Sequence, residues 1–314
     1  MRVLRRLWQG VAHLCWNRGE RRLRAPVRLI LAGVMLYLLN LLFGSVGRWL
    51  SLEAGAYGLG HYIRTFFAIS LGATLSRILL DRQRPAWFGR SALLDIGVGI
   101  LIGGLAMALL FLLALAAGWV RIQTTLFNRT FTLETAYRLL VPLLIFICVG
   151  FYEELLMRGY LLPNLAQGMN LNKLGPRWAL ALAWLLTSIG FGLVHAWNPN
   201  ASVLSTVLIT AAGLMLGLGP ILTGKLGLAV GLHIAWNWFQ GTVFGFAVSG
   251  AQFGLESIFT IRLTGPALWT GGAFGPEAGL LGAVAIIAAT GLILGWVRWR
   301  YGRLAWHLEL TRRH

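Results

Sequence analysis

Charged side chains are scarce in this chain. Asp, Glu, Lys and Arg together make up 12% of its residues, whereas hydrophobic residues make up 57%. A soluble globular domain carries about 25% charged residues, so this chain lacks the polar groups that a water-facing surface would need. A surface that faces lipid needs no such groups. The composition therefore predicts a polytopic integral membrane protein and argues against an ordinary soluble domain.

Cysteine and acidic residues are also few. The two cysteines, Cys15 and Cys148, offer no disulfide framework. Only 10 acidic residues oppose 27 basic ones, which gives a net charge of +17. A charge of this size can indicate nucleic-acid binding, but here the basic residues gather at the ends of apolar runs, with eight arginines in the first 28 residues. That distribution follows the positive-inside rule of membrane proteins, so we expect no nucleic-acid partner.

Eight apolar runs are long enough to cross a bilayer, which takes about 20 helical residues. They lie near residues 29–46, 62–80, 93–118, 138–157, 178–197, 203–223, 227–248 and 279–297. The pattern predicts an all-α fold, a polytopic bundle of about eight transmembrane helices. Because arginines flank both chain ends and the 81–90 loop, we expect both termini on the cytoplasmic side. The expected location is the bacterial or archaeal cytoplasmic membrane.

Composition divides the chain into three parts. Residues 1–28 predict a basic cytoplasmic segment, residues 29–297 a single membrane-embedded helical domain, and residues 298–314 a basic cytoplasmic tail. Two connections within the domain are more than simple loops. Residues 159–177 are expected to continue the fourth helix before the chain turns, and the Gly- and Pro-rich residues 249–278 to form a lid or a cap outside the membrane.

Ionisable residues inside the apolar runs indicate a candidate site, since each costs about 2.5–3.5 kcal/mol at mid-bilayer. The fourth run contains Glu153, Glu154 and Arg158. Residues four apart share a helix face, whereas adjacent residues point in different directions. Glu154 and Arg158 are therefore expected to pair, which leaves Glu153 free to exchange a proton as a general base. The alternative is an ion pair that only links helices.

Two more clusters follow the same spacing. Phe191 and His195 share a face near the end of the fifth run, and His233 and Asn237 share one in the seventh. A His and an Asn that offer donors to one point can stabilise an oxyanion. Singly, His195 could be an ordinary interfacial residue, and the other two could serve only in hydrogen bonds between helices. The three clusters together favour a catalytic site.

In this order, the three motifs resemble the signature of the CPBP family of intramembrane proteases, which includes the CAAX prenyl proteases and is also called the Abi family. The family pattern is Glu-Glu-x-x-x-Arg, then Phe-x-x-x-His, then His-x-x-x-Asn, and this chain carries all three within a motif core of residues 138–245. The resemblance implies an intramembrane endopeptidase that acts on a membrane-associated or lipid-modified substrate.

By position, the resemblance also implies individual roles. Glu153 would activate a water molecule that His195 holds, and His233 and Asn237 would stabilise the oxyanion of the tetrahedral intermediate. The remaining motif residues would orient the site: Glu154, Arg158 and Phe191.

Zinc is an alternative to metal-free chemistry, because two His and one Glu are a known catalytic ligand set. The ligands would be Glu153, His195 and His233. The helical His-Glu-x-x-His arrangement is absent, however, and a Glu with a His can activate water alone. We therefore expect no cofactor and keep zinc as the alternative.

Two other functions compete with proteolysis. A proton-coupled secondary transporter also uses intramembrane Glu and His residues, although the sequence shows no inverted repeat. A non-catalytic peptide-binding or immunity protein of the same fold would use the same pocket. The expected partners are the lipid bilayer and a peptide or lipidated protein, whose identity the sequence does not give.

The depth of the two histidines is an open question at this stage. In a simple up-and-down bundle, His195 falls near the outer end of its helix and His233 near the inner end of its own. One site needs both at the same depth. Shortened or tilted helices, or a segment that re-enters the membrane, would bring them together.

Overall fold

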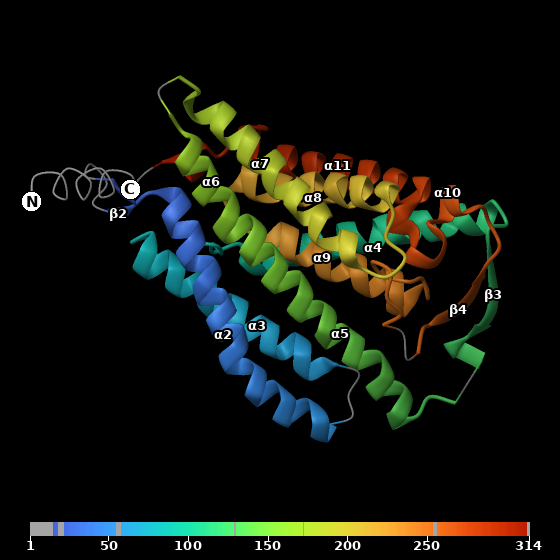
Figure 1. Ribbon diagram of the computed structural model, residues 1–314. Coiled ribbons are helices and arrows are strands. Elements are labelled where there is room, and N and C mark those ends of the chain that lie inside the picture. Colours follow the sequence, from blue (N-terminus) through green and yellow to red (C-terminus); the bar gives the residue numbers. More distant parts are fainter. Residues whose placement is uncertain are drawn as a thin grey trace, which may run out of the picture.

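The computed structural model describes residues 15–17, 22–54, 58–128, 130–171, 173–253 and 256–312. Most of the predicted basic segment 1–28 lies outside the described residues, as does Arg313 of the predicted tail. Within the described part the protein is a helical bundle, drawn in Figure 1.

Seven of the described helices are long and apolar enough to cross a membrane. The long α-helices that form them are α2 (Ala25–Ala54), α3 (Leu59–Leu75), α4 (Ala92–Ala116), α5 (Leu133–Glu154), α7 (Gly175–Val194), α8 (Val203–Thr223) and α11 (Leu280–Tyr301). The predicted fold class, an all-α polytopic membrane bundle, is confirmed.

The fourth of these helices is longer than its apolar run. After α5 the chain makes a π-helical stretch, η3 (Leu155–Leu161), and continues as α6 (Leu162–Met169), so that helix persists over 37 residues. Pro163 lies at the start of α6, directly after the π-helical stretch. The helix therefore continues past residue 159, as the sequence predicts. The change from α to π geometry comes directly after Glu154, and such changes are frequent at functional sites.

The predicted run 227–248 is different from the other seven. It forms a short helix, α9 (Gly227–Trp238), followed by a π-helical turn, η5 (Phe239–Val243), and is not among the seven long helices. Ten of the twelve α9 residues are buried, because the helix lies in the centre of the bundle against α4, α5 and α8. A fully surrounded helix needs no lipid-facing length.

Glycines allow α9 to pack directly on the backbone of α4. A methyl group added at Gly99 of α4 would collide with the carbonyl oxygen of Leu228, and one added at Gly231 of α9 would collide with that of Ile96. Gly97 of α4, two residues before Gly99, has open space around it. The close approach expected from glycine-rich spans is thus present between α4 and α9, and it occurs also between α7 and α8, where a methyl group at Gly192 would collide with the carbonyl oxygen of Thr206.

Both described ends of the chain lie at the same end of the bundle. Figure 1 shows that α2 begins and α11 ends there. The side-chain amide of Asn170, just after α6, donates to the carbonyl oxygen of Thr311 in the 3-10 turn η8 (Leu308–Thr311), 3.1 Å away. Seven long helices would place the ends on opposite sides. The passage of α9 through the centre supplies the eighth crossing.

A buried ion cluster joins α2, α3 and α6 near this end. Asp81, which follows the π-helical turn η1 (Ser76–Leu80), is fully buried. It accepts hydrogen bonds from Arg28 at 2.8 Å and from Asn164 at 2.8 Å, and Arg77 lies 3.4 Å away. Because every partner comes from a different turn or helix, the cluster fixes the relative positions of these three helices, of which α3 reaches the site described next through Tyr62.

Residues 244–279 fold over the opposite end of the bundle. Within them, β4 (Phe259–Leu263) pairs in antiparallel fashion with β3 (Val120–Thr125), which follows α4. The short helix α10 (Ala267–Thr270) and the 3-10 turns η6 (Gly272–Phe274) and η7 (Pro276–Ala278) complete this segment, which we call the cap. The sequence predicts a lid or a cap here but gives no sign of the strand pair, because its two strands are more than 130 residues apart.

Candidate active site

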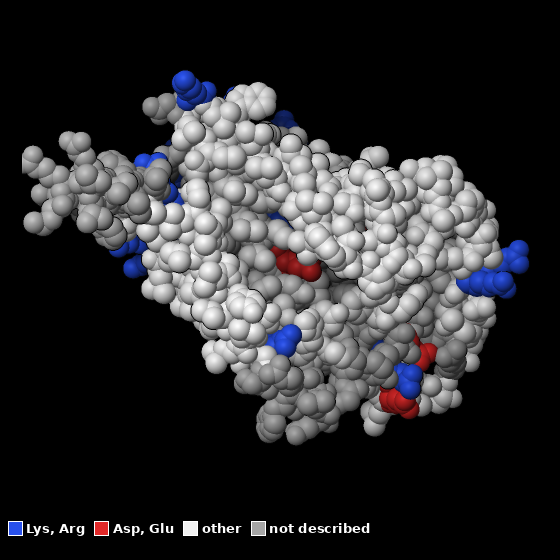
Figure 2. All heavy atoms as spheres, in the orientation of Figure 1, with Lys and Arg blue, Asp and Glu red and all other residues white. Residues whose placement is uncertain are grey.

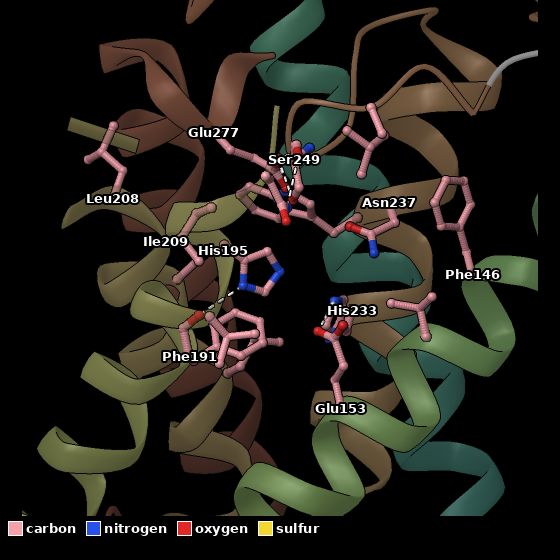
Figure 3. A pocket seen from close by; sticks show the side chains of 18 of the residues that line it. Phe146, Glu153, Phe191, His195, Leu208, Ile209, His233, Asn237, Ser249 and Glu277 are labelled. Carbon is pink, nitrogen blue, oxygen red and sulfur yellow. Dashed lines mark hydrogen bonds and ion pairs between the residues drawn. The ribbon is translucent and has the colours of Figure 1, made fainter. Parts of the chain in front are cut away.

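A cavity of about 260 Å³ lies between α5, α7, α8 and α9 and reaches the cap. Most of its walls are apolar, and its polar lining includes Glu153, His195, His233 and Asn237. Figure 3 shows these four side chains pointing into one space from three different helical segments. On the face shown in Figure 2, charged atoms lie mostly at the edges, except for acidic atoms in a hollow near the middle.

The two adjacent glutamates occupy different environments. Glu154 is fully buried, and its Oε1 accepts hydrogen bonds from Arg158 at 2.7 Å and from Nδ1 of His233 at 2.9 Å. Glu153 keeps 21% of its side-chain surface and lines the cavity. The geometry agrees with the pairing expected from the helical spacing: Glu154 binds Arg158, and Glu153 points elsewhere.

Arg158 lies behind the cavity wall. One guanidinium nitrogen bonds to Glu154, and the other donates to the carbonyl oxygen of Gly213 on α8 at 3.0 Å. The guanidinium carbon lies 4.5 Å from the centre of the Phe191 ring, within the range of a cation–π contact. Phe191 in turn contacts His195, at 4.7 Å between ring centres, and meets His233 edge-on at 5.9 Å. One aromatic ring therefore separates Arg158 from the cavity and touches both histidines.

His195 sits at the end of α7, where the helix changes to the 3-10 turn η4 (His195–Trp197). Its Nδ1 lies 2.8 Å from the carbonyl oxygen of Phe191. A carbonyl oxygen only accepts, so Nδ1 carries a proton, and in the neutral ring Nε2 has a free lone pair. The second ring nitrogen points into the space between His195 and Glu153 (Figure 3). His195 can therefore accept a hydrogen bond from a water molecule there.

His233 and Asn237 present the opposite wall from α9. With Nδ1 of His233 bound to Glu154, its Nε2 faces the cavity, 3.9 Å from Oε2 of Glu153. Asn237 lies one helical turn further on and is 6% exposed. Figure 3 shows its amide directed into the same cavity. The pair offers polar groups to one point, as its spacing predicts.

The two histidines reach one depth because their helices begin at different levels. α9 starts beside Gly219 of α8, which packs near Leu228. α7 starts closer to the end of the bundle where α8 ends: Leu180, already five residues into α7, packs with Ile221 near the end of α8 and with residues of α6. His233 is seven residues into α9 and His195 directly follows α7, yet both line the same cavity. The offset start of a short central helix removes the mismatch that equal spans would create.

The three residues of the zinc alternative, Glu153, His195 and His233, line the same cavity. Glu153 and His233 lie on one side of the cavity and His195 on the other (Figure 3). Among the residues that the structure describes, no three His, Cys, Asp or Glu side chains are arranged to hold a metal ion. We therefore route no chemical step through a metal.

The polar lining also includes residues that the sequence did not point to, among them Asn198, Ser249 and Glu277. Asn198 follows the turn that carries His195, and the other two belong to the cap. The pKa of the Glu277 carboxyl is raised, because the effect of burial is larger than that of the hydrogen bonds from Ser249, which lower it. The signal available in the sequence was the scarcity of acidic residues, since Glu277 is one of only ten.

A membrane-embedded bundle around carboxylate, imidazole and amide groups has the groups that hydrolytic enzymes use. Residues 135–239, about a third of the chain, match the family model described as Rce1-like, type II CAAX prenyl endopeptidase Rce1-like. All seven motif residues fall inside this range. The match confirms the resemblance to the CAAX proteases and supports an intramembrane protease of the CAAX type in general. No curated protein and no solved structure matches the chain.

Proposed function

We propose that this protein is an intramembrane endopeptidase that hydrolyses a peptide bond with a water molecule activated by Glu153 and His195, without a metal. The observation that carries the proposal is the convergence of Glu153, His195, His233 and Asn237 on one mostly apolar cavity. Sequence spacing indicates only which residues share a face of one helix. It does not show that residues of different helices meet.

The attacking water fits between Glu153 and His195. Glu153 keeps part of its surface in the cavity, and its Oε2 has no hydrogen-bond partner among the described residues. It can take one proton from the water, while the lone pair on Nε2 of His195 accepts the other O–H. The resulting hydroxide oxygen forms the new bond to the carbonyl carbon of the peptide.

The oxyanion would be held by His233 and Asn237. Because Nδ1 of His233 already donates to Glu154, a donor at Nε2 requires the doubly protonated ring. Glu153 and Glu154 flank this ring at 3.9 Å and 2.9 Å and favour its positive charge. The imidazolium and the Asn237 amide then supply two preorganised donors, the arrangement that usually contributes most to acyl transfer.

Collapse of the intermediate completes the cycle. Glu153 returns its proton to the leaving nitrogen as the C–N bond breaks, and its carboxylate is regenerated. The products are a new carboxyl terminus and a free amine. Glu154 and Arg158 take no proton in this scheme and act by fixing the His233 ring.

The apolar setting of the cavity supports a membrane-associated or lipid-modified substrate. Its walls are lined by apolar side chains of α5, α7, α8 and α9, such as Val149, Ile209 and Trp236. A peptide segment within the bilayer, or a lipid-modified tail, can enter such a cavity at little cost in hydration. A polar substrate would have to give up its hydration to enter it. We place the protein in the bacterial or archaeal cytoplasmic membrane, with both basic ends in the cytoplasm.

Replacement of the base tests the proposal. Glu153→Gln removes the proton acceptor and preserves the shape, so cleavage of membrane peptides by purified protein should fall at least about a hundredfold. The matched control is Glu134→Gln on the same helix, which breaks only the exposed pair with Arg138 and should leave cleavage unchanged. Comparative proteomics of membrane peptides then identifies substrates. Full activity in Glu153→Gln would refute the assignment.

Metal removal addresses the zinc alternative. We expect that dialysis against a strong chelator leaves the rate of cleavage unchanged, because Glu153 and His195 suffice to activate water. Metal analysis of the purified protein accompanies the assay. Loss of activity that added zinc restores would show that the mechanism needs the metal.

A further inference from the structure

The cap contributes a polar pair to the wall of the catalytic cavity. Ser249 and Glu277 both line it, and Figure 3 shows them on the far side of His195 from Glu153. Both residues lie outside the range 135–239 that matches the family model. Their contribution is therefore a property of this chain's cap, separate from the three motifs.

Ser249 is held in an unfavourable backbone conformation. Its φ angle is +48°, in the left-handed region that non-glycine residues seldom adopt. Such a conformation persists only where the surroundings determine it strongly. Here the backbone N–H and the hydroxyl of Ser249 both donate to Oε2 of Glu277, at 2.6 Å and 3.0 Å. One carboxylate oxygen thus fixes both the main chain and the side chain of Ser249.

The same residue is tied to the turn that carries His195. The side-chain amide of Asn198 donates to the carbonyl oxygen of Ser249 at 2.9 Å. The backbone N–H of Asn198 donates to the carbonyl oxygen of His195 at 3.1 Å. A continuous path of hydrogen bonds therefore runs from Glu277 through Ser249 and Asn198 to His195.

Tight backbone packing leaves this region little freedom to move. A methyl group at Gly250 would collide with the carbonyl oxygen of Pro199, and one at Gly275 with that of Ala247. The N–H of Gly250 also donates to the carbonyl oxygen of Phe274 at 2.8 Å. The turn after His195, the segment 247–251 and the segment before Glu277 are in direct contact, so a shift in one moves the others.

We infer that Glu277 is a positioning residue of the active site: bound to Ser249, it holds segment 247–251 and, through Asn198, the turn of His195 in the geometry that hydrolysis needs. The inference rests on the proposed function. Glu277 would act on the rate by keeping Nε2 of His195 aligned with the water. A misplacement of about 1 Å at such a point can cost about a hundredfold in rate.

Substitutions at residue 277 separate shape from loss of contact. In Glu277→Ala the N–H and the hydroxyl of Ser249 lose their acceptor, and kcat per folded molecule should fall about ten- to a hundredfold while KM changes little. Glu277→Gln keeps a carbonyl oxygen that can accept both bonds, and should retain kcat within about threefold. The control, Thr264→Ala, breaks a hydrogen bond from the cap to the carbonyl oxygen of Gly118 and should leave kcat unchanged.

A double-mutant cycle tests whether Glu277 and Ser249 act together. If they form one unit, Ser249→Ala should lower kcat much less in the Glu277→Ala background than it does in the wild-type protein. Independent contributions would multiply instead. Full multiplication, or wild-type kcat in Glu277→Ala, would overturn the inference.

Amide hydrogen exchange supplies a readout that does not depend on proteolysis. In Glu277→Ala, but not in Glu277→Gln, exchange should become at least about tenfold faster in residues 195–198 and 247–251. If the wild-type protein cleaves no peptide, the proposed function fails and exchange alone decides about the positioning contact. Unchanged exchange in Glu277→Ala would refute that contact whatever the activity.

Discussion

Glu153 and Glu154 are neighbours in sequence and lie on either side of the His233 ring, but only Glu153 lines the cavity. Glu154 is enclosed by Arg158 and His233, so its charge is compensated on two sides. Glu153 faces the cavity without a hydrogen-bond partner for its Oε2 within the described residues. Helix geometry alone produces this division, because a rotation of about 100° per residue sends adjacent side chains in different directions.

Loss of Arg158 should affect stability as well as activity. Arg158→Met leaves the Glu154 carboxylate buried with only His233 beside it, and breaking a buried pair costs about 3–5 kcal/mol. We expect a lower midpoint of thermal unfolding in detergent and loss of cleavage. Arg158→Lys keeps the charge but cannot bond both Glu154 and Gly213 while stacking on Phe191, so it should recover only part of the stability.

The double variant Arg158→Met with Glu154→Gln provides the control for this prediction. It removes both charges together and should regain stability relative to Arg158→Met, because no buried charge is left uncompensated. Equal unfolding midpoints for the two variants would show that the Glu154–Arg158 pair is not what stabilises this part of the bundle.

At the scale of elements, the short central helix α9 decides where the site lies. It brings His233 and Asn237 to the level of His195, and its position depends on direct backbone contact with α4 at Gly99 and Gly231. The cap closes the same space from one end through Ser249 and Glu277. The active site is therefore assembled from elements that meet only in the folded bundle.

A methyl group on α4 should displace α9. Gly99→Ala would push against the carbonyl oxygen of Leu228, and forcing extra volume into a packed contact typically costs about 1–3 kcal/mol. We expect a lower unfolding midpoint and reduced kcat, since His233 and Asn237 move with α9. Gly97→Ala on the same helix meets no atom within 4 Å and is the matched control. Equal activity in the two variants would argue against this role of the helix contact.

At the scale of the whole molecule, seven long helices and one short central helix bring the end of α11 back to the end of the bundle at which α2 begins. Figure 1 shows the beginning of α2 and the end of α11 at the same end of the bundle. Several arginines lie near that end, among them Arg28, Arg77 and Arg303. The positive-inside rule then favours the cytoplasm for this side.

Cysteine labelling can test this orientation. In a background with Cys15 and Cys148 replaced by Ser, Leu133→Cys at the start of α5 should react with a membrane-impermeant maleimide in intact cells. Leu133 is 91% exposed and lies at the opposite end from the α11 terminus. Arg303→Cys should react only after permeabilisation. The reverse pattern would show that the protein is inserted the other way.

Local rules account for much of what could be predicted here. Apolar runs of bilayer length gave the helical class, and the i, i+4 spacing gave the Glu154–Arg158 pair and the shared faces of Phe191 with His195 and of His233 with Asn237. These features depend on residues close in sequence, where helix geometry fixes relative direction. The seven motif residues were found from this spacing together with the family resemblance.

Other features depend on contacts between distant parts of the chain. The length of α9 was overestimated because a helix surrounded by protein is as apolar as one that faces lipid. Hydropathy cannot distinguish the two. The paired residues of β3 and β4 are at least 134 residues apart in sequence, and Ser249 and Glu277 are 28 apart. No local pattern encodes such pairings.

The preference of apolar side chains for lipid and the periodicity of helices were enough to predict a membrane-embedded helical protein and the side chains that share a face on each helix. Tertiary structure decided that those faces meet at one depth, that Phe191 separates Arg158 from the cavity, and that the cap adds Glu277 to its wall. The physical reason is that side-chain direction is a local property of the backbone. The relative level of two helices is set by packing, here by the glycines that seat α9 against α4.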